Sequence, residues 1–159
     1  MSNVQRIPKI KIDKISQNTK VAVITALWNT DLTQNMESEC LKELNKHKIK
    51  ITTIKVAGSF ELIAAAKVAL VKKFDAIVVL GVVLNGETPH FDYVCQAVTK
   101  GMTELAVEYG KPIGFGVLTC NNYKQAYQRA GFKDSKENKG KETAEAVLLS
   151  LISHKQLAK

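Results

Sequence analysis

The sequence predicts an α/β fold in which a central four-stranded parallel sheet carries helices on both faces. Short β-branched apolar runs alternate along the chain with segments whose apolar residues recur at helical spacing. One run, from Asp75 to Leu84, is apolar at nearly every position, as expected of a strand covered on both faces. Right-handed crossovers then place the helices on both sides of the sheet, which gives a flavodoxin-like three-layer sandwich.

The first strand and helix are predicted between residues 20 and 47. Lys20 to Ala26 reads KVAVITA, and Asp31 follows it at the place expected for a helix N-cap. The helical face repeats every four residues: Met36, Cys40 and Leu44. The charged residues between them are expected mostly on the outer face: Glu37, Glu39, Lys42 and Glu43.

A second strand and helix follow, and then the most apolar strand. Ile49 to Val56 is strand-like, and Gly58 and Ser59 interrupt it. The next helix is indicated by a stripe of apolar residues: Leu62, Ile63, Ala66, Ala69 and Leu70. The run from Asp75 to Leu84 is predicted to be the central strand.

The remaining elements complete the sheet. Pro89 is suited to a helix start, Gly110 to its end, and the stripe between them is Val94, Val98, Met102 and Leu105. Pro112 to Thr119 is the fourth strand, and Asn122 caps a short helix that runs to Arg129. After a polar connection, the last amphipathic helix is marked by Ala144, Val147, Leu148 and Leu151.

Composition is that of an ordinary globular protein and bounds the class of function. With 159 residues, 45% of them hydrophobic and 24% charged, one domain spanning residues 1–159 is expected. The longest apolar run, residues 76–84, is about half the roughly 18 residues that a membrane span needs. Residues 1–20 lack the apolar core of a secretory signal, so a cytoplasmic protein is expected.

Net charge and cysteine content narrow the partners. A charge of +8 favours anions, which include nucleic acid and phosphorylated metabolites. Aromatic residues are only 6% and the lysines are scattered through predicted helices, which does not favour nucleic acid. The cysteines lie far apart without a paired motif, so they are interpreted as buried free thiols rather than as disulfide partners or zinc ligands: Cys40, Cys95 and Cys120.

The loop after the central strand contains the sharpest functional signal. In a parallel sheet, ligands bind outside the carboxyl ends of the strands, here after Ala26, Val56, Leu84 and Thr119. The third of these loops reads Gly86-Glu87-Thr88 at a helix start, where unpaired amides and the helix dipole favour an anion. His90 follows, and an imidazole suits proton transfer near neutral pH. The alternative is a histidine that merely hydrogen-bonds the loop, which is how His47 and His154 are interpreted.

Three further loops carry weaker signals. Ser59 and Glu61 offer a hydroxyl and a carboxylate at a helix start, either for a polyol or heterocycle or simply as a cap. Trp28, the sole tryptophan, is suited to stacking on a planar ligand, although core packing is the alternative. Arg129 could bind a phosphate through two hydrogen bonds, or it could belong to a solvated basic face with Lys133, Lys136 and Lys139.

Considered together, these segments resemble a known enzyme family. The runs VAGSFELIAAAKVAL, DAIVVLGVVLNGETPHFDYV, GKPIGFGVLTCNNYKQAYQRAG and NKGKETAEA are similar, in this order, to signature segments of the 6,7-dimethyl-8-ribityllumazine synthases of riboflavin biosynthesis. The resemblance extends from Val21 to Ile152. It implies a transferase that joins 5-amino-6-(D-ribitylamino)uracil to 3,4-dihydroxy-2-butanone 4-phosphate, giving 6,7-dimethyl-8-ribityllumazine, phosphate and water without a metal or redox cofactor.

The resemblance also implies roles for individual residues. His90 matches the proposed proton-transfer residue and Arg129 the arginine that pairs with the phosphate. Gly86, Glu87 and Thr88 match the phosphate loop. The pyrimidine and its ribityl chain are expected to contact the remaining matched positions: Trp28 by stacking, Ser59 and Glu61 on the ribityl side, Val82 and Val83 through the backbone, and Phe115 and Lys139 as further pocket residues.

The resemblance also implies how the chains assemble. Family members form pentamers in which Phe115, Arg129 and Lys139 are expected to reach a neighbour's site, and residues 1–19 are expected to extend onto a neighbouring subunit. The segment 131–140 is slightly longer than the tight turn of shell-forming members, which favours free pentamers or pairs of them. Association with a riboflavin synthase stays open.

Three positions depart from the common family pattern: Leu27 where arginine is common, Trp28 in place of phenylalanine, and Gln128 in place of glutamate. None removes a group that the chemistry requires. The alternatives are another phosphate-binding catalyst of the same fold and a non-catalytic lumazine- or flavin-binding protein.

Overall fold

The computed structural model describes residues 11–159 and has the predicted α/β class. Residues 1–10 of the expected N-terminal extension lie outside the described part. The sheet is four-stranded and parallel, with the order β2-β1-β3-β4. Its strands are β1 (Lys20–Ala26), β2 (Lys50–Val56), β3 (Ala76–Leu84) and β4 (Ile113–Cys120). The helices are α1 (Thr30–Asn45), α2 (Leu62–Val71), α3 (His90–Tyr109), α4 (Tyr123–Tyr127) and α5 (Lys139–Leu157).

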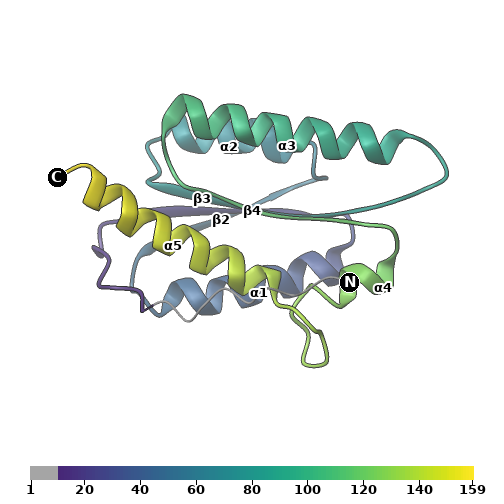
Figure 1. Ribbon diagram of the computed structural model, residues 1–159, viewed down its shortest axis with the longest axis horizontal. Coiled ribbons are helices and arrows are strands. Elements are labelled where there is room, and N and C mark those ends of the chain that lie inside the picture. The colour runs from purple at the N-terminus through teal and green to yellow at the C-terminus, as the bar shows by residue number, and fades with distance from the viewer. Residues whose placement is uncertain (1–10) are drawn as a thin grey trace.

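The helices cover the sheet from both sides, as the alternating sequence pattern predicts. In Figure 1 the sheet is seen edge-on, with α2 and α3 above it and α1, α4 and α5 below. The loop that joins β3 to α3 extends away from the sheet at the right-hand edge of this view. Because all four strands run in parallel, the loops after their carboxyl ends meet at one edge.

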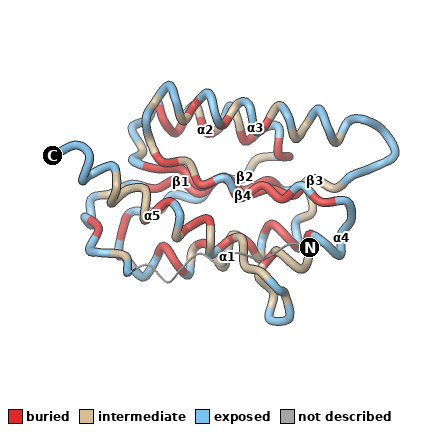
Figure 2. The backbone as a smooth tube through the Cα atoms, viewed as in Figure 1, coloured by how far each residue is buried: buried red, intermediate tan, exposed pale blue. Residues whose placement is uncertain are grey.

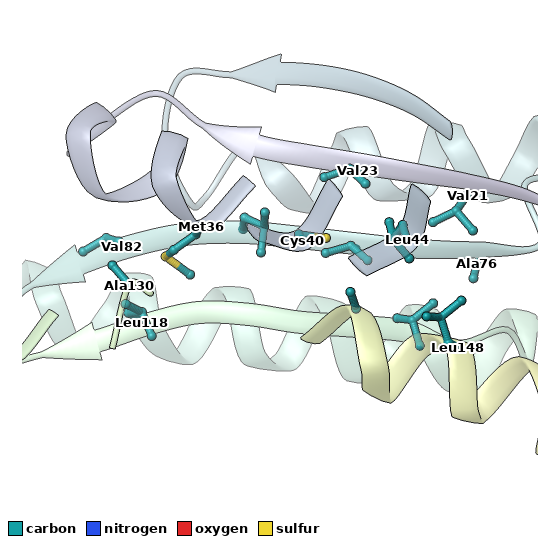
Figure 3. Packing of buried hydrophobic residues seen from close by; sticks show 14 of the residues in the cluster. Val21, Val23, Met36, Cys40, Leu44, Ala76, Val82, Leu118, Ala130 and Leu148 are labelled. Atoms are coloured by element: carbon teal, nitrogen blue, oxygen red, sulfur yellow. The ribbon is translucent and has the colours of Figure 1, made fainter. Parts of the chain in front are cut away.

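Alternation along β1 divides the core into two layers. Val21 and Val23 pack on the α1 and α5 side, while Ala22 and Ile24 pack on the α2 and α3 side. Figure 3 shows the first layer, in which Val21 and Val23 of β1 share one cluster with the buried face of α1 and with Leu148 of α5. The predicted apolar face of α1 is confirmed: Met36, Cys40 and Leu44 are fully buried.

The central position of β3 is confirmed by its burial. Residues 76–82 are all buried, and β3 pairs with β1 on one side and β4 on the other. Figure 2 shows buried backbone concentrated in the sheet and on the inward sides of the helices. The outer strands differ, because β2 is mostly exposed and Phe115 of β4 is 43% exposed.

Three local predictions need correction. Asp31 is not the N-cap of α1, because Asn29 occupies that position in a left-handed conformation and Asp31 lies in the first turn. Glu43 is buried rather than outward-facing, and its carboxylate lies 2.6 Å from the Lys46 ammonium. Arg129 lies beyond α4 rather than at its end, since this helix stops at Tyr127.

The cysteines are free thiols, and two of the three are buried as predicted. Burial, with a smaller contribution from the Glu37 charge, raises the pKa of the Cys40 thiol to about 12. Cys95 on α3 is only half-buried. A thiol with so high a pKa stays protonated at neutral pH, so Cys40 serves as a packing residue.

Within residues 11–159, no helix has both the length and the apolar composition that crossing a membrane would require.

Candidate active site

A cavity of about 500 Å³ opens at the carboxyl ends of β1 and β3, and we call it the strand-end cavity. It is lined by residues from two strand-to-helix loops, the end of β3 and the first turns of α3: Trp28, Asn29, Ser59, Phe60, Glu61, Val82, Val83, Leu84, His90 and Val94. Aromatic and aliphatic walls with a few polar groups are typical of a small-molecule site.

The Trp28 ring forms an exposed wall of this cavity and is not part of the core. Its side chain is 65% exposed, and its backbone N–H donates to the Ala57 carbonyl at 3.1 Å. The ring lies directly on the next loop, because a Cβ on Gly58 would be 2.9 Å from Trp28 Cε3. An exposed ring held against a neighbouring loop can stack on a planar ligand at little conformational cost.

Asn29 fixes the loop that carries Trp28. It adopts φ 58° and ψ 48°, a conformation that asparagine tolerates better than most residues. Its side-chain amide donates to the Val82 carbonyl at 3.1 Å, which ties the end of β1 to β3. This hydrogen bond thereby fixes the loop that carries Trp28 relative to β3, which lines the cavity.

Ser59 and Glu61 are held by close contacts with glycine backbone. A Cβ on Gly81 would lie 2.5 Å from Ser59 Oγ, so the bare strand lets this hydroxyl pack against β3. Glu61 Oε2 accepts the Gly58 N–H at 2.9 Å, which resembles a cap, yet Glu61 is exposed and lines the cavity. The carboxylate has further acceptor positions, so capping and ligand binding are compatible.

His90 is the first residue of α3, and it is exposed on the cavity wall. Within residues 11–159 its ring makes no hydrogen bond, so the alternative of a histidine that only braces the loop has no support in the structure. An unengaged imidazole beside Trp28 and Glu61 is suited to proton transfer to or from a bound ligand.

The loop before α3 presents backbone amides to solvent. Asn85 N–H donates to the Cys120 carbonyl at 2.9 Å, which anchors the start of the loop to the end of β4. Gly86, Glu87 and Thr88 are exposed, and within residues 11–159 their N–H groups have no hydrogen-bond partner. Free amides at the N-terminus of a 20-residue helix favour an anion.

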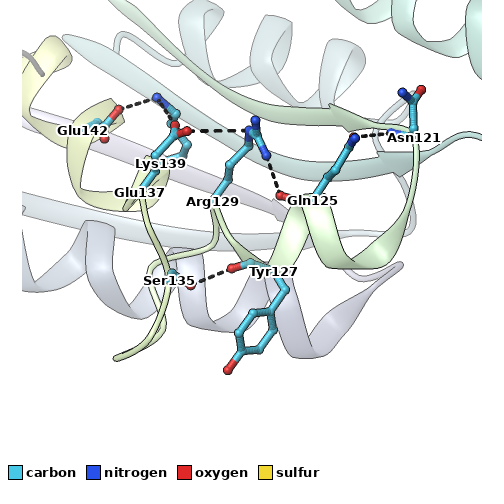
Figure 4. Close-up of polar contacts among 8 residues, drawn as sticks. All are labelled: Asn121, Gln125, Tyr127, Arg129, Ser135, Glu137, Lys139 and Glu142. Atoms are coloured by element: carbon cyan, nitrogen blue, oxygen red, sulfur yellow. Dashed lines mark hydrogen bonds and ion pairs between the residues drawn. The ribbon is translucent and has the colours of Figure 1, made fainter. Parts of the chain in front are cut away.

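A second cavity of about 290 Å³ lies along the outer strand β4, and we call it the β4-edge cavity. Its lining contains two cations and a half-exposed ring: Arg129, Lys139 and Phe115. Arg129 donates from a terminal guanidinium nitrogen to the Gln125 carbonyl at 2.8 Å, as Figure 4 shows. Glu137 Oε1 lies 3.9 Å from Arg129 Nε.

The structure therefore divides the predicted site residues into separate groups. The strand-end cavity brings together Trp28, Ser59, Glu61, Val82, Val83 and His90. The β4-edge cavity brings together Phe115, Arg129 and Lys139. Gly86, Glu87 and Thr88 line neither cavity, although Asn85 ties their loop to Cys120 on the wall of the second. Neither cavity by itself contains all of these groups.

Residues 18–155 match the family model of 6,7-dimethyl-8-ribityllumazine synthase. The chain belongs to this family. A lumazine synthase from Paenarthrobacter aurescens (strain TC1) is 45% identical over 141 residues, covering 87% of this chain and 86% of the relative. One from Streptomyces coelicolor is 44% identical over 142 residues, covering 89% and 88%. Another, from Kineococcus radiotolerans, is 42% identical over 153 residues, covering 95% and 93%.

Several residues around the two cavities were not predicted from the sequence. Asn29, Phe60, Leu84 and Val94 also line the strand-end cavity. Each is adjacent to a predicted site residue or lies one helical turn from it, so widening each motif by a few positions would have found them. Glu137 had no such signal, because it lies within a charged connection that is typical of a solvated surface.

Proposed function

We propose that this chain is a 6,7-dimethyl-8-ribityllumazine synthase, a transferase that condenses 5-amino-6-(D-ribitylamino)uracil with 3,4-dihydroxy-2-butanone 4-phosphate. The products are 6,7-dimethyl-8-ribityllumazine, inorganic phosphate and water. The observation that carries the proposal is the strand-end cavity, where an exposed tryptophan, a hydroxyl, a carboxylate and an unengaged imidazole surround a space of about 500 Å³. The choice of reaction and substrates is supported by membership of the lumazine synthase family.

The pyrimidine substrate fits the chemistry of the strand-end cavity. Its planar ring stacks on Trp28, and the backbone of Val82 and Val83 offers hydrogen-bonding groups at the ring edge. The ribityl hydroxyls bind the Ser59 hydroxyl and the Glu61 carboxylate. These contacts hold the attacking amine in a fixed place, which converts a bimolecular step into an effectively unimolecular one.

The reaction requires repeated proton movements beside that ring. The amine attacks the ketone carbonyl and water leaves to give an imine; the carbon–oxygen bond to phosphate then breaks, and inorganic phosphate departs. Loss of phosphate leaves an enol at the hydroxyl-bearing carbon, and its tautomerisation creates a new carbonyl there. The ribityl-bearing nitrogen attacks this new carbonyl, and a second loss of water closes the ring. His90 moves protons in these steps, because it is the imidazole on the wall of the cavity.

The phosphate group binds the free amides of Gly86, Glu87 and Thr88 together with the Arg129 guanidinium. We further propose that Arg129, Lys139 and Phe115 come from a neighbouring chain of a pentamer. This part of the proposal is supported by the separation of the two cavities within one chain and by the exposed rings of Trp28 and Phe115.

The first experiment is a two-substrate assay on the purified protein. Incubation with both substrates is expected to produce lumazine fluorescence and an equal amount of inorganic phosphate, whereas omitting either substrate should abolish both signals. Lumazine binding without turnover would favour the non-catalytic alternative. A protein that neither binds lumazine nor forms it would contradict the proposed function altogether.

A further inference from the structure

The connection between α4 and α5 fixes Glu137 beside two cations. Its backbone N–H donates to the Gln128 carbonyl at 3.0 Å, and the Lys139 N–H donates to the Arg129 carbonyl at 2.9 Å. Residues 137–139 are therefore paired in an antiparallel manner with residues 128–130. This pairing places the Glu137 side chain next to both Arg129 and Lys139, although ten positions separate the two cations along the chain.

Asn138 anchors this pairing to two helices. Its side-chain oxygen accepts the Lys141 N–H at 3.0 Å, and its amide donates to Glu39 on α1 at 2.7 Å. Gly131 has a φ of +84°, and a Cβ there would lie 2.6 Å from Asn138 Oδ1. The location of Glu137 is thus determined by the fold around it, not by a freely moving surface segment.

The Glu137 carboxylate lies between the two cations but is closer to one than to the other. One oxygen lies 2.8 Å from Lys139 Nζ and the other 3.9 Å from Arg129 Nε, as Figure 4 shows. The side chain is only 13% exposed. Arg129 and Lys139 line the β4-edge cavity, whereas Glu137 does not belong to its lining. The carboxylate therefore restrains both cations without occupying the space that they border.

The charges in this cluster balance before any ligand binds. Arg129 and Lys139 face Glu137 and Glu142, whose carboxylate lies 2.7 Å from Lys139 Nζ. Burial by itself would lower the pKa of Lys139, but hydrogen bonds to Glu137 and Glu142 outweigh it and raise the pKa above its usual value. Lys139 is consequently held in its charged form.

We propose that Glu137 is a positioning residue for anion binding, which holds the Arg129 guanidinium and the Lys139 ammonium where both can contact one phosphate group. This inference rests on the proposed function of the β4-edge cavity. It also opposes a simpler expectation, because an acidic residue beside an anion site should weaken anion binding through repulsion. The two possibilities predict opposite effects when the charge is removed.

Glu137→Gln removes the charge while keeping the side-chain size. If Glu137 positions the cations, the KM for the phosphorylated substrate should rise by about tenfold, as expected from losing one charged contact. The kcat should change by less than about twofold, because a contact made equally in the ground state and the transition state affects KM and not kcat. A lowered KM for the phosphorylated substrate would show that Glu137 only competes with the anion, and it would overturn the proposal. An unchanged KM would also overturn the proposal.

Two further variants separate positioning from general damage. Glu137→Asp keeps the charge with a shorter reach, so its KM should fall between those of the wild type and Glu137→Gln. Glu145→Gln is the matched control, because Glu145 lies on α5 and its carboxylate pairs with Lys141 at 3.6 Å, away from Arg129 and Lys139. A KM increase in Glu145→Gln as large as that in Glu137→Gln would overturn the positioning role.

Calorimetry with inorganic phosphate tests the same claim without turnover. The assembled wild-type protein should bind phosphate, and Glu137→Gln should bind it about tenfold more weakly. If the wild type makes no lumazine, the proposed function fails while this measurement still reports on Glu137. Equal or tighter phosphate binding by Glu137→Gln, or no binding by the wild type, would contradict the inference.

Discussion

Replacing His90 with alanine should lower kcat by about 10²-fold or more, within the 10² to 10⁴-fold range of one acid–base group, and leave measurable turnover. The imidazole lies on the wall of the strand-end cavity at the start of α3, and residues 11–159 provide it with no other hydrogen-bonding role. Turnover persists because binding still brings the amine and the ketone together. Single-turnover measurement of lumazine formation at saturating substrate checks the prediction.

His154→Ala is the matched control for this substitution. His154 is an exposed residue in the last turn of α5, outside both cavities, so its removal should leave kcat unchanged. A folded His90→Ala protein with no detectable product would show that His90 is indispensable. A folded His90→Ala protein with full activity would remove it from the proton-transfer role.

Replacing Arg129 with alanine should raise the KM for the phosphorylated substrate by about 10- to 100-fold, since a hydrogen bond to a charged group contributes about 1.5–3 kcal/mol. The guanidinium lines the β4-edge cavity, where its terminal nitrogen donates to the Gln125 carbonyl and Nε lies near Glu137. The KM for the pyrimidine should change little. Initial rates at varied concentrations of each substrate separate the two constants.

Two variants show whether charge or shape matters at this position. Arg129→Lys keeps the charge but loses the planar fork, so its KM should be intermediate. Lys133→Ala removes an exposed cation from the same connection and should leave the KM unchanged. A KM that is unaltered in Arg129→Ala would exclude Arg129 from the phosphate site.

The fold could be predicted from the sequence wherever the spacing of apolar residues indicated which positions are buried. The run from residue 76 to 84 is apolar throughout because β3 is covered on both faces, and the four-residue repeat of α1 reflects its single buried face. The prediction that Asp31 is the N-cap of α1 was wrong for a physical reason. Asn29 takes that position through its left-handed backbone and a hydrogen bond to Val82, a residue more than fifty positions away. The residues around position 29 do not indicate a hydrogen bond to so distant a residue.

The candidate site was predicted as a set of residues but not as an arrangement. Each loop motif identified chemistry that its own residues carry, such as the amides before α3 or the ring of Trp28. Which residues share a cavity depends on strand order, and β4 lies at the opposite side of β3 from β1. Arg129 and Lys139 are consequently separated from Trp28, and the ion pairs of Glu137 arise from backbone pairing that no periodicity reveals.

The departures at Leu27 and Trp28 fall on two exposed neighbouring residues, of which Trp28 lines the strand-end cavity. Leu27 is 49% exposed and its N–H donates to the Val56 carbonyl at 2.8 Å, so the loop is held by its backbone and not by the Leu27 side chain. Trp28 forms an exposed aromatic wall of that cavity.

The measurement that tests the shared site most directly is complementation between His90→Ala and Arg129→Ala chains. The two substitutions lie in different cavities of one chain. After dissociation and random reassociation, about a quarter of the sites at neighbouring-chain interfaces should combine an intact strand-end cavity with an intact β4-edge cavity. The rate at substrate concentrations below the mutant KM should then rise clearly above that of either parent. Mixed oligomers, verified by native mass spectrometry, whose rate stays at the average of the two parents would contradict a site completed by a neighbouring chain.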